Sequence, residues 1–409
     1  MTYQSNFNAY VAYKAQSALG SQASGSGASI LRTAGGGGIK LSKAAVESNE
    51  IRRDGMRSRG RHGTQKIAAE YNGELSIGSH ETIIEAVCRD TWSSADLTLT
   101  QSDFTSLTTG AHTIVLTSGD PRTLGLRVGD VIELLNYSGG NNAENLRVTG
   151  LSATTITVAE TLSVNASADT SCSIVRRGKK LTAYGGASIV KRYFTLEEYE
   201  YDIDQSTVAT DFVWAGVKFG MSPNGLITCN PHGIGTGQVE AKASGASPFF
   251  TTPSASSGAP LAVVDATVRL NGADLVQLTS FDLSVDIGAS APDVFGSGAI
   301  KYAPEVFGGQ LAVSMNLSML RSDLSVFSDF IAETQYSLHI LAVENEGEPK
   351  DFISIYVPNF TLGGVDASAL SKQGGGRTQS ISIPSSLVGI DNTGAGFDAT
   401  MIKFQSTGA

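Results

Sequence analysis

The chain has few of the residues on which most enzymes and disulfide-stapled proteins depend. Among 409 residues there are only three cysteines and five histidines, and charged residues make up 17%. The cysteines, Cys88, Cys172 and Cys229, are too few and too scattered for a disulfide framework. We therefore expect them to be reduced, buried thiols.

Sequence motifs of catalysis are missing as well. The chain contains no G-x-S-x-G, no H-E-x-x-H and no dinucleotide fingerprint. The run GGGGIKLS fails as a phosphate-binding loop because Ile39 separates the last glycine from Lys40. Cys229 and His232 could ligate zinc, but a second matched pair of ligands is absent. These absences argue against an enzyme and predict no metal site and no cofactor.

Positive charge is in deficit too. Lysine and arginine number 29 against 39 acidic residues, a formal charge of -10. A protein that grips DNA phosphates tightly usually carries the opposite sign. The sequence also lacks any apolar run of about 18 residues, and its start, MTYQSNFNAYVAYKAQ, lacks a signal-peptide pattern. We expect a protein with no membrane contact that is made and assembled in a cytoplasm.

Glycine is abundant, with 46 residues, and together with little charge this favours strands and turns. Apolar residues alternate from Ile67 to Ile77, which predicts a half-buried strand. The spacing of the apolar residues then changes from that of a strand to that of a helix. Ile83, Ile84, Val87 and Cys88 form a helical stripe, for which Ser79 is the expected N-cap and Glu81 lies in the first turn.

The same order recurs later in the chain. Alternating residues from Leu311 to Met319 predict a strand, and Ser322 is the expected cap of a following helix. The predicted buried stripe of this second helix consists of Leu324, Phe327, Phe330 and Ile331. Two such units suggest a pseudo-duplicated core.

Composition divides the chain into four parts. Residues 1–39 read as a flexible N-terminal arm because glycine and serine dominate them. Residues 40–96 and 181–409 form the first and second parts of a core. Within the second part, the low-complexity segment Ser244–Pro260 is a connector between the two halves of this core. Between them, residues 97–180 show short strands at the spacing of a small all-β domain, either an SH3-like barrel or an Ig-like sandwich. Later signals are a hairpin turn at Asn271-Gly272, between alternating strands at Val264–Leu270 and Phe281–Ile287, and a glycine-rich loop, Gly363–Arg377.

The chain has a basic cluster, Arg52–Arg61, and an acidic cluster, Glu197–Asp204, and each has more than one interpretation. The basic cluster could contact nucleic acid, dock on an acidic neighbour or form a solvated loop, and it lacks the interleaved aromatics of single-strand binders. The acidic cluster could hold a catalytic pair, but its alternation favours one acidic strand face shared by Glu198, Glu200, Asp202 and Asp204. We predict that the two clusters meet between subunits. The candidate contact residues are Arg52, Arg53, Arg57, Arg59, Arg61, Glu197, Glu198, Glu200, Asp202 and Asp204.

Three blocks carry a family resemblance. SNEIRRD followed by GELSIGS and a helix into Trp92 is the first. FTLEEYEYDI with FVWAGVKFGMSPNGLIT, from Phe194 to Thr228, is the second, and LTSFDLSVDIGASAPDVFGSGA, from Leu278 to Ala299, is the third. In this order they make the chain similar to the tail tube proteins (major tail proteins) of long-tailed bacteriophages, although many members of that family lack the insertion at 97–180.

The resemblance implies a mainly β fold: a tail-tube-type β-sandwich or barrel core with short flanking helices, plus the inserted small β domain. It implies rings, usually of six subunits, that stack into a tube conducting double-stranded DNA without specific binding. Implied partners are further copies of the chain and other tail proteins such as the tape measure, the tail terminator and the baseplate or tip. The alternative is a secreted or surface β-rich adhesin or decoration protein, for which a signal peptide would be expected.

Overall fold

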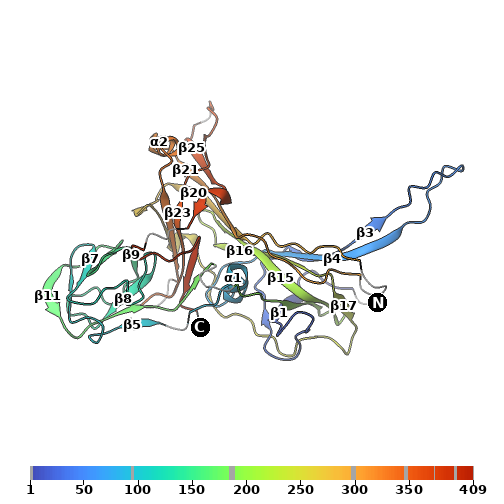
Figure 1. Ribbon diagram of the computed structural model, residues 1–409, viewed down its shortest axis with the longest axis horizontal. Helices are drawn as coiled ribbons and strands as arrows, with labels where there is room; N and C mark the ends of the chain where they lie inside the picture. The colour runs from blue at the N-terminus through green and yellow to red at the C-terminus, as the bar shows by residue number, and fades with distance from the viewer. Residues whose placement is uncertain are drawn as a thin grey trace.

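The computed structural model describes residues 3–93, 96–183, 189–295, 301–344, 349–372, 374–390 and 394–408. The predicted mainly β fold with short helices is confirmed (Figure 1). The end of the third sequence block, residues 296–299, lies outside the described residues. Neither α-helix within the described ranges is long and apolar enough to cross a membrane.

Three antiparallel sheets make up the described part of the chain. The first sheet has twelve strands: β1 (Ala9–Ala15), β2 (Ser29–Ile30), β3 (Gly37–Val46), β4 (Arg61–Tyr71), β14 (Phe194–Glu200), β15 (Gln205–Met221), β16 (Thr228–Gly235), β17 (Val239–Lys242), β20 (Leu278–Asp286), β21 (Ala312–Leu320), β24 (Gly364–Ala367) and β25 (Thr378–Ile383). The second sheet has eight: β5 (Leu97–Leu99), β6 (Leu107–Thr109), β7 (Thr113–Leu116), β8 (Val131–Leu135), β9 (Leu146–Leu151), β10 (Thr155–Val158), β11 (Asn165–Asp169) and β12 (Ser173–Arg176). The third has seven: β13 (Lys179–Thr182), β18 (Ala266–Leu270), β19 (Ala273–Asp274), β22 (Tyr336–Val343), β23 (Phe352–Phe360), β26 (Val388–Gly389) and β27 (Lys403–Ser406). The helices are α1 (Glu81–Cys88) and α2 (Ser325–Ile331), with 3-10 turns η1 (Val263–Asp265) and η2 (Ser385–Leu387).

Strand β15 is the spine of the first sheet. It is 17 residues long, and its first half pairs with β14 and β17 while its second half pairs with β16 and β20. Trp214, fully buried near its middle, makes edge-on ring contacts with Tyr13, Phe194 and Phe212. The main hydrophobic core also takes in the apolar side chains of the third sheet, so the first and third sheets pack as a sandwich.

The expectation that residues 1–39 form a flexible arm without a strand is wrong for much of this segment. Strand β1 pairs with β14 along its full length, from Ala9 opposite Glu200 to Ala15 opposite Phe194. Ala12 is fully buried with Phe250, which belongs to the stretch predicted as a connector. Long-range pairing overrides the weak local signal here, because glycine and serine around the strand hide its short apolar pattern.

The Asn271-Gly272 turn forms, but its second strand is not the one expected. Both residues have positive φ, 49° and 83°, and β18 pairs across the turn with the short β19. The predicted partner, from Phe281 to Ile287, becomes β20 and joins β15 and β21 in the other sheet. The chain therefore crosses between the two sheets immediately after the hairpin.

The two helices differ from their predictions in capping and in burial. The N-cap of α1 is His80, and the side chain of Ser79 bonds the carbonyl of Ser76, so Ser79 is not the cap. Similarly, α2 begins after Leu324, and Ser322 is not its cap. Apolar residues of α1 are buried as expected, but α2 has no buried residue, which contradicts its predicted buried stripe.

The inserted segment has a sheet and a hydrophobic core of its own. Its eight strands run from β5 to β12, and its buried residues include Leu107, Leu134, Leu146 and Ile174. In Figure 1 it forms the lobe at the opposite end of the molecule from the β3–β4 hairpin.

A buried polar joint fastens the insertion to the core. The Lys403 ammonium lies 2.8 Å from the Asp130 carboxylate and donates to the carbonyl of Val128 at 2.7 Å, and the Lys403 and Asp130 side chains are 1% and 0% exposed. Gln405 bonds both the amide and the carbonyl of Val131, each at 2.8 Å. Asp130 has a lowered pKa: burial alone would raise it, but the Lys403 and Lys180 cations outweigh that effect.

Candidate assembly surfaces

The β3–β4 hairpin projects from the body as an arm (Figure 1). Its strands pair from Gly37 opposite Tyr71 out to Val46 opposite Arg61, and β3 is exposed along most of its length. Residues 47–60 connect the two strands, and we call them the arm tip. A hairpin this exposed gains little stability from packing within its own chain. Its surface is therefore available to contact another molecule.

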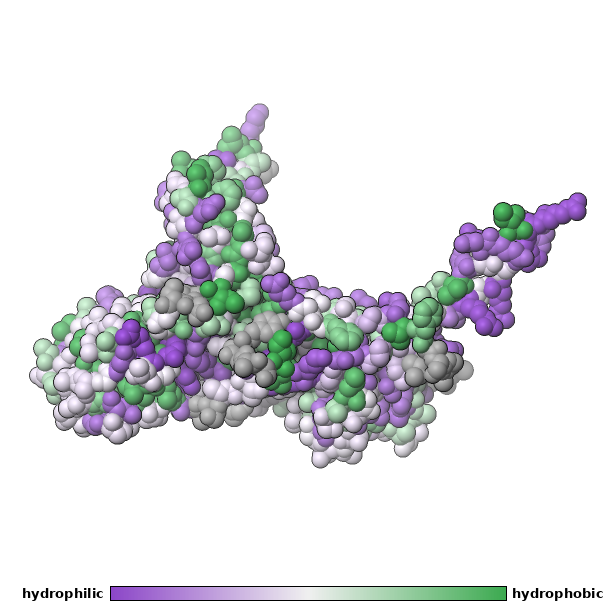
Figure 2. All heavy atoms as spheres, in the orientation of Figure 1, coloured by the Kyte–Doolittle hydropathy of each residue, from purple (hydrophilic) through white to green (hydrophobic). Residues whose placement is uncertain are grey.

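The predicted basic residues gather at this arm tip and at the start of β4. Arg52 is paired with Asp54 at 2.6 Å and Arg57 with Glu47 at 3.1 Å, all of them exposed. Within the described ranges, Arg53, Arg59 and Arg61 have no carboxylate partner. The tip also carries two exposed apolar side chains, Ile51 and Met56. Figure 2 shows apolar atoms among hydrophilic ones near the end of the arm.

The predicted acidic face is only partly correct. Strand β14 ends at Glu200, so Glu198 and Glu200 share a strand face, whereas Asp202 and Asp204 lie in the turn that follows. The strand pattern failed there because a turn, with Asp204 at φ 50°, ends the alternation four residues early.

Most of these carboxylates already have partners within the chain. Glu197 is fully buried and accepts bonds from the amides of Phe249 and Phe250 at 2.6 and 3.0 Å, so it cannot meet a neighbour. Glu198 accepts from the amide of Ile39 and the hydroxyl of Tyr71, each at 2.7 Å. Burial raises its pKa, an effect that these two donors reduce without cancelling.

The turn carboxylates are held as well. Asp202 accepts bonds from the side chains of Ser5 and Asn8, and Asp204 accepts from Ser244 and Tyr199. These donors lower the pKa of both carboxyl groups. The arginines and carboxylates of the predicted contact are thus not brought together within one subunit, and docking between subunits stays a prediction.

A polar face covers the first sheet on the side away from the core. On β20, β21 and β25 the buried apolar residues alternate with small polar ones, and register aligns the latter across the strands: Asp282 opposite Asn316, and Asn316 opposite Ser382. Lys218 on β15 aligns with Ser284 of β20 and lies 3.9 Å from Glu70. We call this surface the polar face. It consists of Lys218, Ser280, Asp282, Ser284, Asp286, Ser314, Asn316, Ser318, Ser380 and Ser382.

The end of the upright lobe in Figure 1 exposes apolar side chains. Leu324, Phe327 and Ile331 repeat at helical spacing on α2, and each is more than two-fifths exposed. The other apolar residues of this helix, Val326 and Phe330, pack partly against the core. Figure 2 shows hydrophobic atoms at the top of this lobe, as expected for a surface that another molecule covers.

Other candidate sites from the sequence do not assemble. Cys229 is fully buried on the core side of β16, while His232 bonds Asp286 at 2.7 Å on the polar face. No cluster of three or more histidine, cysteine or acidic residues that could hold a metal occurs among the described residues. The three cysteines are free and buried, and burial raises the pKa of each thiol.

Sequence reasoning missed two of these surfaces. The signal for the polar face was present, since serine, aspartate and asparagine occupy every second position from Ser280 to Ser284 and from Ser314 to Ser318. The exposure of α2 had no signal, because a helical apolar stripe looks the same whether its own core or another chain covers it.

Comparison with known proteins identifies a family for this chain. No curated protein matches the chain. One solved structure with a match is the SPP1 tail tube, determined by solid-state NMR and cryo-EM, with 16% identity over 31% of this chain and 75% of that one and a TM-score of 0.22. The family model for phage tail tube proteins matches residues 6–384. The chain therefore belongs to the phage tail tube protein family.

Proposed function

We propose that copies of this chain form rings, six to a ring, that stack into a hollow tail tube through which double-stranded DNA passes from the capsid to the host. The family to which the chain belongs is structural, and its members form phage tails. Assembly would take place in the cytoplasm of the bacterial host. The tube would meet other tail proteins, such as the tape measure, the tail terminator and the baseplate or tip.

The polar face is the observation that carries this proposal. Apart from Lys218, its side chains are those of serine, aspartate and asparagine, and strands β15, β20, β21 and β25 present them in aligned rows. If these strands of each subunit continue around the ring, their free edges are removed and the polar face lines the channel.

The charges on this face suit DNA that has to slide. Asp282 and Asp286 are acidic, and the cation Lys218 stands close to Glu70. Charges act over about 8 Å at physiological salt, so the wall affects the phosphates only where DNA passes close to it. An acidic wall with few cations repels phosphates and would not trap the DNA.

The arm suits the stacking of rings. It extends the first sheet beyond the body of the molecule (Figure 1). Its tip carries exposed apolar side chains and cations that have no ion-pair partner in the described ranges. A projecting hairpin of this kind can reach a subunit of the adjacent ring, while other surfaces form the contacts within one ring.

Negative-stain electron microscopy of the purified protein, in low and in moderate salt, tests the proposal. We expect rings or tubes with a central hole. A cryo-EM map of those tubes should then place Ser284, Ser314 and Asn316 at the channel wall.

Two outcomes would contradict the proposal. Compact closed particles without a channel would favour the adhesin or decoration-protein alternative. Tubes whose channel is lined by another surface would keep the tube and reject the polar face as its wall.

A further inference from the structure

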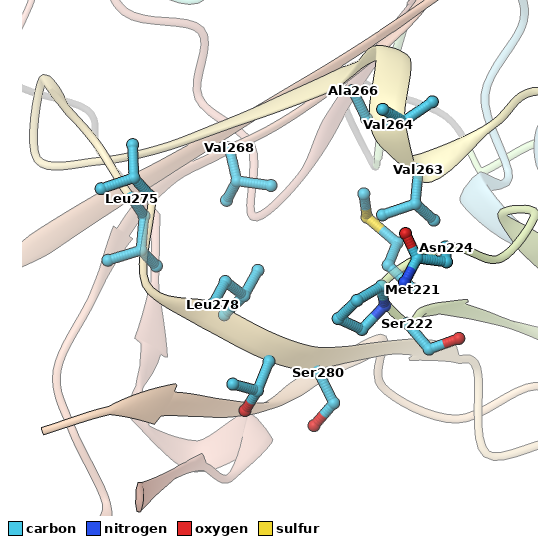
Figure 3. Close-up of a pocket in the computed structure, with 13 residues that line it drawn as sticks. Met221, Ser222, Asn224, Val263, Val264, Ala266, Val268, Leu275, Leu278 and Ser280 are labelled. Carbon is cyan, nitrogen blue, oxygen red and sulfur yellow. The ribbon is translucent and has the colours of Figure 1, made fainter. Parts of the chain in front are cut away.

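An apolar groove opens where the β18–β19 hairpin approaches the start of β20 and the turn after β15. Figure 3 shows Val263, Val268 and Leu278 directed into the same space, with Met221 on the facing side. The cavity has a volume of about 310 Å³. Its lining contains no charged side chain.

The chain itself leaves part of the apolar lining of this groove exposed to solvent. Val264 and Val276, which belong to its lining, are 82% and 86% exposed. Large aliphatic side chains left this open next to an apolar cavity mark a surface that another molecule covers.

The arm tip has the complementary features. Ile51 is 99% and Met56 67% exposed, and each is followed directly by an arginine, Arg52 and Arg57. An apolar cavity of about 150 Å³ is enough to hold benzene, so this groove has room for both side chains. The tip of the same chain lies far out on the arm (Figure 1), so the occupant has to come from a second copy.

Charge complementarity also favours this occupant. Arg53 and Arg59 on the arm tip have no ion-pair partner within the described ranges. Asp265 lies between the lining residues Val264 and Ala266. This carboxylate has no ion-pair partner in the described part of the chain. By contrast, the acidic cluster around Glu197 is buried or engaged within its own subunit.

We propose that the arm tip of one copy seats Ile51 and Met56 in the apolar groove of a second copy, with Arg53 and Arg59 against Asp265. This inference rests on the proposed tube function, since the contact would hold neighbouring subunits of the tube together. It replaces the cluster from Glu197 to Asp204 as the acceptor of the arm.

Cysteine cross-linking in assembled tubes tests the contact. The native cysteines are buried, so an Ile51→Cys/Val276→Cys variant should give intermolecular disulfides in a ladder on non-reducing gels. Two matched variants compare other sites: Ile51→Cys/Asp202→Cys reports docking on the acidic turn, and Ile51→Cys/Val294→Cys reports chance collision at an exposed valine. A stronger ladder from either comparison variant overturns the proposal.

Charge reversal gives an independent test. Arg53→Glu/Arg59→Glu should lower the yield of tubes about tenfold, since interfacial charge pairs are worth at least about 1.4 kcal/mol. Adding Asp265→Lys should restore part of the yield, and adding Glu200→Lys/Asp202→Lys should not. Normal tubes from the reversed arginines would reject this contact and leave the tube function standing, whereas a wild-type protein without rings or tubes would reject both.

Discussion

Paired opposite charges occur at two places in the molecule: at the joint that fastens the insertion to the core, and at the tip of the arm. The pairs lie in different surroundings. At the joint, Lys403 and Asp130 are almost completely buried. At the tip, the Arg57 and Glu47 side chains are 85% and 63% exposed. A buried pair has given up its hydration and needs its partner, whereas water replaces the partner of an exposed one. The joint therefore fixes the shape of one subunit, and the tip stays free to exchange its partners for those of another.

Breaking the joint should have the largest effect on stability. Lys403→Met leaves the Asp130 carboxylate buried with less compensation, so the free energy of unfolding should fall by about 3–5 kcal/mol. Urea unfolding followed by circular dichroism measures the change. Lys191→Met, which removes a pair whose lysine side chain is 60% exposed and whose partner Glu305 is 23% exposed, is the control and should cost less than about 1 kcal/mol. Equal losses from the two variants would remove the difference between buried and exposed pairs.

Acid should weaken the joint before it affects the tip. His339 lies in the third sheet beside the insertion, and burial, followed by the charges of Arg147 and Lys403, holds its pKa well below the usual value. Below about pH 6.5 the unfolded chain protonates this histidine while the folded chain does not. The free energy of unfolding should therefore fall between about pH 7.5 and about pH 5.

The variant His339→Gln isolates this contribution, since it removes the titrating group and should flatten the pH dependence. Some slope should remain, because burial and the charge of Arg32 lower the pKa of His80 in the main core to about 4, with the same sign. Asp130 does not contribute in this range, since its lowered pKa matters only below the usual aspartate value of about 3.9. An unchanged profile for His339→Gln would show that the joint does not sense acid.

The smallest effect on stability is expected at the tip. Arg57→Ala removes one exposed ion pair, so unfolding in urea should change by no more than about 1 kcal/mol. A larger loss would mean that the tip is ordered by its own charges, and the distinction between joint and tip would have to be abandoned.

Much of the strand content could be read from the sequence, because alternation reports a buried face directly. The strands around Ile67–Tyr71, Phe281–Val285 and Val313–Met319 follow the predicted pattern, with one face buried. Strand β1 was missed because its burial depends on β14, which lies about 180 residues away and leaves no local trace.

The assembly surfaces were harder to predict. The basic cluster was found, but its division into paired Arg52 and Arg57 and unpaired Arg53 and Arg59 depends on how the tip folds back on itself. The acidic residues were found too, but a strand pattern cannot tell that Glu197 turns inward to cap two backbone amides. Composition locates charge along the chain, and only the fold decides whether a charge is already satisfied.

The side-by-side pairing of β3, β4, β16 and β15 has a mechanical consequence. The arm is not hinged to the body by a loop, since β4 continues into the sheet through β16 and from there to the 17-residue β15. A pull along the arm loads many backbone hydrogen bonds in shear at the same time, because these strands run antiparallel to one another and their bonds lie across the direction of force. Each subunit can thus bear tension from a neighbour that holds its arm without first unravelling at the point of attachment.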